Sequence, residues 1–226
     1  MILAIRLCIA AMRRSQKISR VLPILFNAEM VRAILEGRKS CTRKIVKSQQ
    51  LIGMLPDKCK NGAPEKFLKE KKLMFKPYCD MTDIELINTA YKAPYQPGDI
   101  LYVRETWKKA PNGYYYYEDW QRNDIADVTK WKPSIHMPKE AARIWLKVTD
   151  VRVERLQEIS AESALAEGAD KYIHTNGGLD ENMTITSFIG IWNSTIKKSD
   201  IDRYGWDANP YVWIIKFERC EKPEGV

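Results

Sequence analysis

The 226-residue chain carries a formal net charge of +8, and 45% of its residues are hydrophobic, which suits one large domain or one domain with insertions. This apolar content argues against a wholly disordered chain. Five scattered cysteines without a Cys-x-x-Cys pair, and only two histidines, argue against a disulfide framework or a zinc site, so we expect no metal, no cofactor and a reducing, cytoplasmic location.

Positive charge is concentrated near the N-terminus. Residues 1–72 hold 17 Lys and Arg against 5 Asp and Glu, which predicts an anionic partner, nucleic acid before membrane. In residues 1–19 a short apolar stretch comes before most of the positive charges of the segment, which is the wrong order for a secretory signal. No stretch is long enough to span a bilayer, so we interpret residues 1–19 as an N-terminal extension and expect no membrane partner.

The N-terminal third predicts a strand, a helix and a second strand. Residues 20–27 form an apolar run typical of a buried strand, and Asn27 begins a helix that ends at Gly37. Four apolar side chains share one face of this helix: Met30, Val31, Ile34 and Leu35. Residues 42–47 predict a short strand, and the polar, lysine-rich residues 48–92 predict an insertion.

The middle and end of the chain predict more strands than helices. A Pro97-Gly98-Asp99 turn leads into a strand with Leu101 and Val103 on one face, and an Asn112-Gly113 turn predicts a hairpin. Residues 142–156 show the longest alternation of apolar and polar residues, which predicts a long strand. The closing strand is predicted at 209–220, before a tail at 221–226. Two helices are predicted between these strands, at 160–169, with Ser160 and Gly168 as caps, and at 187–196. This pattern predicts an α+β fold with a mixed β-barrel or rolled sheet decorated by helices.

The segment "GRKSCTRK" resembles the G-x-K-x-x-T-x-R motif of the ASCH domain, a member of the PUA-like superfamily. Four later stretches are similar, in the same order, to ASCH-like proteins of bacteriophages and prophages: "QPGDILYVRETW", "PSIHMPKEAARIWLKVTDVRVERLQEIS", "ALAEGA" and "WDANPYVWIIKFE". The resemblance covers residues 20–220 and is weakest in 48–92. It implies a single PUA-like β-barrel domain with flanking helices and an insertion, and a cleft suited to RNA or a nucleoside.

The resemblance also implies candidate catalytic residues. Some small ASCH proteins are amidohydrolases that remove acyl groups from N4-acetylcytidine with a Lys, a Thr and a Glu, which match Lys39, Thr42 and Glu167 here. The final Arg of the motif is replaced by Lys44, with Arg43 beside it, so the planar grip of a guanidinium on an anion is lost at that position.

The proposed chemistry is plausible from the residue types themselves. A threonine hydroxyl is a poor nucleophile until a base takes its proton. A lysine is such a base only when it is neutral, and the neighbouring cations Arg38, Arg43 and Lys44 favour the neutral form. Glu167 would orient the lysine or pass a proton to the leaving amine, but as an anion it favours the charged lysine, so the two influences compete.

Each candidate also has a simpler interpretation. Lys39 and Thr42 fit phosphate contacts in a binding groove as well as they fit catalysis, and Glu167 fits the role of an ordinary carboxylate on a helix. The substrate-binding candidates are the three cations of the motif and four residues in or near the predicted strand and turn: Arg38, Arg43, Lys44, Arg104, Glu105, Trp107 and His136. Their alternatives are a surface Glu105–Arg104 ion pair and a structural turn histidine, whereas Trp107 is the best base-stacking candidate.

We therefore predict an ASCH-domain protein that acts on RNA or modified nucleosides, with an amidohydrolase of the N4-acetylcytidine type as the leading hypothesis. The alternatives are a non-catalytic RNA-binding module and a ribonuclease, either of phage or prophage origin. Cys41 lies beside Thr42, but no histidine near it in sequence would activate its thiol, so it is not expected to be the nucleophile.

Overall fold

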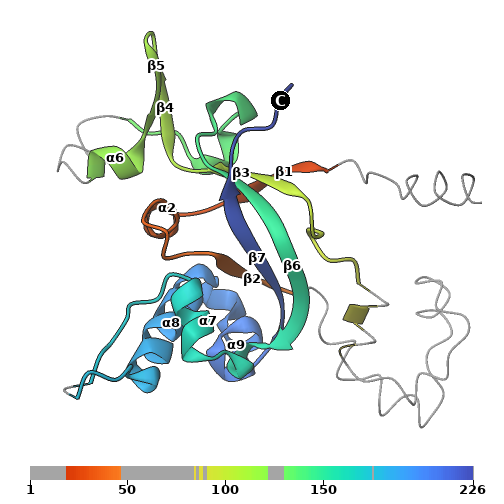
Figure 1. Ribbon diagram of the computed structural model, residues 1–226, viewed down its shortest axis with the longest axis vertical. Coiled ribbons are helices and arrows are strands. Elements are labelled where there is room, and N and C mark those ends of the chain that lie inside the picture. Colours follow the sequence, from red (N-terminus) through yellow and green to blue (C-terminus); the bar gives the residue numbers. More distant parts are fainter. Residues whose placement is uncertain are drawn as a thin grey trace, which may run out of the picture.

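The computed structural model describes residues 19–46, 84, 87–88, 91–121, 130–174 and 176–225 (Figure 1). The predicted extension, apart from residue 19, and nearly all of the predicted insertion at 48–92 lie outside the described residues. None of the helices in the described ranges is long and apolar enough to cross a lipid bilayer.

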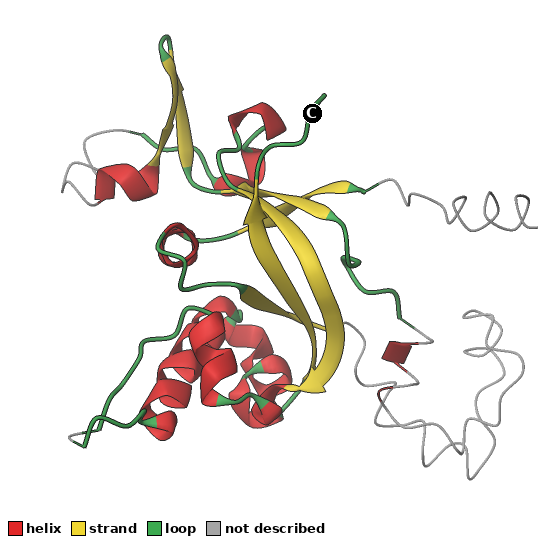
Figure 2. Ribbon diagram, viewed as in Figure 1, coloured by secondary structure: helices red, strands yellow, loops and turns green. Residues whose placement is uncertain are grey.

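The predicted α+β fold is confirmed, and its centre is a mixed five-stranded sheet (Figure 2). The strands, in spatial order, are β1 (Val21–Leu25), β3 (Ile100–Arg104), β6 (Trp145–Arg155), β7 (Tyr211–Cys220) and β2 (Cys41–Ile45). Only the β1–β3 pair is parallel. Within the described part of the chain, β1 and β2 are the two edges and no ladder joins them, so the sheet is open and the predicted barrel closure is not observed.

The two long strands carry the core on both of their faces. In β7, Val212 and Ile214 pack toward the helices, whereas Trp213 and Ile215 pack into the larger core on the other face. Burial on both faces explains the continuous apolar run of β7, since a central strand has no solvent-facing side. In β6 the register shifts at a bulge between Val148 and Asp150, which interrupts the predicted alternation.

The strand β1 differs from its prediction as a buried strand. Ile24 is buried, but Leu25 is 48% exposed. The reason is its position, because an edge strand pairs on one side only and its apolar residues are covered only where another element packs against them.

The helices begin at the predicted polar caps. Asn27 accepts a hydrogen bond from the Met30 amide at 2.9 Å at the start of α2 (Ala28–Leu35), and Ser160 caps α7 (Ala161–Ala166). The helix α8 (Glu181–Thr195) starts earlier than predicted, since the Asp180 side chain caps it. Together with α9 (Ile201–Tyr204), α7 and α8 gather on one side of the sheet (Figure 1). Short 3₁₀ turns lie at Ser134–His136, Lys139–Ala141, Leu156–Glu158, Lys198–Asp200 and Trp206–Ala208.

The predicted hairpin projects from the body of the molecule (Figure 1). It consists of β4 (Trp107–Ala110) and β5 (Gly113–Tyr116), and the aromatic run continues into the short helix α6 (Tyr117–Gln121). Buried Glu118 of α6 pairs with Arg32 of α2 at 2.6 Å. This ion pair fastens the base of the projection to the body.

Candidate functional site

A groove of about 520 Å³ runs between α2, β2 and α8. Both sheet edges contribute to it, through Leu25 at the end of β1 and residues 42–44 of β2. Thr106 and Ser134, at the root of the hairpin, line one part of the groove, and Phe26, Met30, Phe188, Ile191 and Trp192 supply its apolar walls. This size and mixed lining suit a small organic ligand.

Glu167 is a buried carboxylate that lines this groove. Its Oε2 atom accepts a hydrogen bond from Lys39 Nζ at 2.8 Å, and its Oε1 atom accepts one from Arg43 Nη1 at 3.0 Å. The Lys39 and Arg43 side chains are only 0% and 1% exposed, so water screens these ion pairs weakly. Two buried cations therefore hold one carboxylate in a defined place.

A glycine makes this approach possible. Glu167 ends α7 as its C-cap, and Gly168 follows with a φ of +95°, a conformation that favours glycine. A Cβ atom at Gly168 would lie 3.1 Å from the Ala33 Cβ and 3.7 Å from the Lys39 Cβ. The ends of α2 and α7 thus approach closely, which brings Lys39 to Glu167.

Lys39 lies behind the groove and is not among the residues that line it. Besides Glu167 Oε2, its Nζ donates to the carbonyl oxygens of Cys41 at 2.7 Å and of Glu167 at 2.8 Å. An ammonium group has three hydrogens, and three oxygens receive them. This arrangement suits a charged lysine that orients the carboxylate, and the role of Lys39 as a base stays a prediction.

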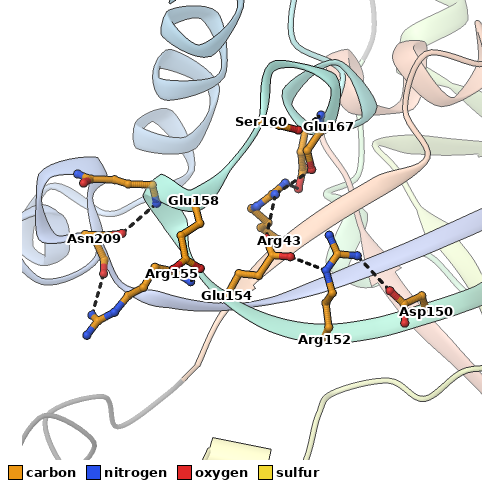
Figure 3. Close-up of polar contacts among 11 residues, drawn as sticks. Arg43, Asp150, Arg152, Glu154, Arg155, Glu158, Ser160, Glu167 and Asn209 are labelled. Atoms are coloured by element: carbon orange, nitrogen blue, oxygen red, sulfur yellow. Dashed lines mark hydrogen bonds and ion pairs between the residues drawn. The ribbon is translucent and has the colours of Figure 1, made fainter. Parts of the chain in front are cut away.

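Arg43 joins the groove to a line of charges along β6. Its Nη2 atom donates to Ser163 Oγ at 2.9 Å and lies 3.9 Å from Glu154 Oε2, and Glu154 in turn pairs with Arg152 (Figure 3). Among the described residues, no partner reaches the buried Nε atom of Arg43. Arg43 thus brings a planar guanidinium to the groove. The adjacent Lys44, which replaces the final Arg of the motif, lies with its Nζ 5.3 Å from the Tyr95 ring centroid.

Thr42 is buried and lines the groove from the other face of β2, since consecutive strand residues point to opposite faces. No group in the described ranges forms a hydrogen bond with its hydroxyl. The structure thus brings Thr42 and Glu167 to one groove and joins Lys39 to Glu167. The hydroxyl is available to a ligand.

The remaining predicted binding residues do not line the groove. Arg38 is exposed and pairs with Glu36 at 2.7 Å, and Arg104 donates to the Met137 carbonyl at 2.7 Å. His136 is exposed in the 3₁₀ turn at Ser134–His136. Ser134 and Thr106, which are close to these residues in the chain, line the groove instead.

Glu105 and Trp107 belong to a separate cluster under the hairpin. Glu105 forms two hydrogen bonds of 2.9 Å with Arg143, not with Arg104, and burial raises the pKa of its carboxyl. Trp107 packs with Met137 and other apolar residues of this cluster. The two residues therefore help to attach the hairpin.

The Cys41 thiol is unsuited to nucleophilic chemistry. It is buried on the face of β2 that packs against the helices, and burial raises its pKa to about 12. At neutral pH the thiol is protonated, and the thiolate is the reactive form. Among the residues that the structure describes, no group of three or more His, Cys, Asp or Glu side chains is arranged to hold a metal ion.

Several groove residues were not predicted. The α8 residues Phe188, Ile191 and Trp192 form one apolar wall, and Ser163 orients Arg43. The apolar spacing at 187–196 signalled a helix, but a single sequence carries no signal that this helix faces β2.

Comparison of the chain with protein-family models, with curated proteins and with solved structures gave no match. The geometry of the groove is therefore the basis for a functional proposal.

Proposed function

We propose that this chain is an ASCH-type, PUA-like protein that hydrolyses an acyl amide on the exocyclic amine of a modified nucleoside bound in the groove. One observation carries the proposal: Thr42 and Glu167 line the same groove, and Lys39 bonds Glu167. These are the three residues that the resemblance to the N4-acetylcytidine amidohydrolases assigns to catalysis. Both edges of the open sheet line the groove, which is consistent with a rolled PUA-like sheet.

In the proposed reaction, Thr42 Oγ1 attacks the acyl carbon, and the bond from this carbon to nitrogen breaks. The hydroxyl proton passes to Glu167, directly or through water, and from there to the leaving amine. Water then hydrolyses the acyl-threonine ester, releasing a carboxylic acid and restoring the hydroxyl. Because all three donor hydrogens of Lys39 are engaged, we assign it to positioning Glu167 in place of its predicted role as the base.

The test is acetate release from N4-acetylcytidine by the purified protein. Thr42→Ala is expected to lower the turnover rate at least 100-fold, and Thr42→Ser to retain part of it. Thr186→Ala is a matched control, since Thr186 is an exposed residue of α8 whose hydroxyl bonds only the Asn182 carbonyl among the described residues. Unchanged turnover in Thr42→Ala, with nucleoside binding intact, excludes the nucleophile assignment.

A non-catalytic RNA-binding module is the second candidate, and the full engagement of the Lys39 ammonium favours it, because such a lysine needs only a structural role. The basic N-terminal third supports an RNA partner. Binding to single-stranded RNA would then weaken steeply with salt while no acyl nucleoside is hydrolysed. Cleavage of a labelled oligonucleotide would instead identify a ribonuclease.

A further inference from the structure

The hydrogen-bonding pattern of β2 leaves one set of its backbone groups without a partner strand. Val46 N donates to Tyr211 O at 3.0 Å, and Phe217 N donates to Ser40 O at 2.9 Å. In an antiparallel ladder, hydrogen-bonded pairs alternate along the strand. The even-numbered residues of β2 therefore bond to β7, whereas Cys41, Arg43 and Ile45 direct their N–H and C=O groups away from it.

The groove runs over this free edge. Thr42, Arg43 and Lys44 all line it, although their side chains alternate between the two faces of the strand. A groove that contacts consecutive residues in this way must cross the strand edge. The Cys41 carbonyl is occupied by Lys39 Nζ at 2.7 Å. Arg43 is not one of the residues that bond to β7 in the ladder, and no other main-chain hydrogen bond among the described residues involves its N–H or C=O.

We propose that the Arg43 main-chain N–H and C=O determine ligand specificity, by forming a two-point contact with a planar heterocycle. This inference rests on the proposed function and names the groups that bind the substrate. The matching ligand edge has a hydrogen-bond acceptor beside an N–H donor. In an N-acylated cytosine these groups are the ring N3 and the exocyclic N–H. The acceptor receives the Arg43 N–H, and the donor bonds the Arg43 carbonyl.

The walls of the groove favour a flat ring as the occupant. Phe26 and Met30 come from the β1–α2 side, and Phe188 and Ile191 come from the α8 side. A ring that lies in line with the strand edge would be covered by apolar side chains on both faces. An added peptide strand needs a longer row of free groups, but the Cys41 carbonyl is already taken and Ile45 is not among the lining residues.

This orientation is compatible with the proposed chemistry. The exocyclic N–H that bonds the Arg43 carbonyl belongs to the amide that is cleaved. Thr42 projects from one face of β2, and Glu167 bonds the Arg43 guanidinium on the other. A ring held at the strand edge therefore presents its acyl amide between the hydroxyl and the carboxylate.

The test is amide hydrogen exchange, measured by NMR on the ¹⁵N-labelled full chain carrying Thr42→Ala, which prevents turnover. Without ligand, the Arg43 amide is expected to exchange faster than the Lys44 amide, which the ladder protects. Saturating N4-acetylcytidine is expected to slow Arg43 exchange at least 10-fold and to leave Lys44, the internal control, unchanged. N4-acetyl-N4-methylcytidine lacks the N–H and is expected to bind at least 10-fold more weakly.

Three results would overturn the inference. If N4-acetylcytidine binds but Arg43 exchange is unaltered, or if the methylated analogue binds equally well, the two-point contact is refuted while the proposed function stands. If neither nucleoside binds, both the inference and the proposed function fail.

Discussion

Replacing Glu167 with Gln removes the one anion that lies between two buried cations. The substitution keeps the size of the side chain but leaves Lys39 and Arg43, which are 0% and 1% exposed, without their shared carboxylate. Removing one partner of a buried ion pair costs about 3–5 kcal/mol, because the remaining charge stays desolvated. We expect a loss of this size for Glu167→Gln, and about 3 kcal/mol for Lys39→Met, in which Arg43 still pairs with Glu167.

The double variant separates charge coupling from simple loss of contacts. Lys39→Met combined with Glu167→Gln removes one cation and the anion together, so its destabilisation should fall short of the sum of the single losses by about 1–3 kcal/mol. Urea denaturation, monitored by tryptophan fluorescence, measures each free energy of unfolding. Glu162→Gln, at an exposed position of α7, is the matched control and should change stability by less than about 0.5 kcal/mol.

The reasoning is refuted if Glu167→Gln costs less than about 1 kcal/mol, or if the two substitutions are additive within about 0.5 kcal/mol. Either result would mean that the three charged groups are not coupled in the folded protein.

Three further substitutions test individual features. Because burial raises the Cys41 pKa from 9.0 to about 12, the folded state favours the protonated thiol. Its stabilising effect is complete below pH 9 and is lost as the pH rises toward 12. The unfolding free energy should fall by about 1.4 kcal/mol by pH 10, and Cys41→Ala should lack this fall in pH-dependent denaturation. Gly168→Ala should cost about 1–2 kcal/mol in the urea assay, because φ is +95° and the new Cβ meets Ala33. The raised pKa of Glu105 makes its contribution to stability largest in acid and smaller as the pH rises through the raised value, and a Glu105→Gln variant with an identical pH profile would contradict this.

Local patterns in the sequence were sufficient for the main strands and for the starts of α2 and α7, whereas α8 begins before its predicted range. The caps Asn27 and Ser160 and the hairpin depend on interactions between residues close in the chain, so they were predicted correctly, although the two turn residues are Pro111 and Asn112 and not Asn112 and Gly113. The apolar run of β7 was recognised as a strand, but its burial on both faces follows from its central place in the sheet. The motif containing Lys39 and Thr42 was also visible, together with Glu167, through its resemblance to a family.

Only the tertiary structure decided what these residues face. Lys39 and Glu167 are 128 positions apart, and their contact depends on the close approach of α2 and α7 at Gly168. The same holds for Trp107 and Glu105, whose side chains face the hairpin cluster and not the groove. A sequence by itself specifies propensity and periodicity, which are local. The direction of a side chain and the partner of a buried charge depend on packing between segments distant in the chain, which no local pattern encodes.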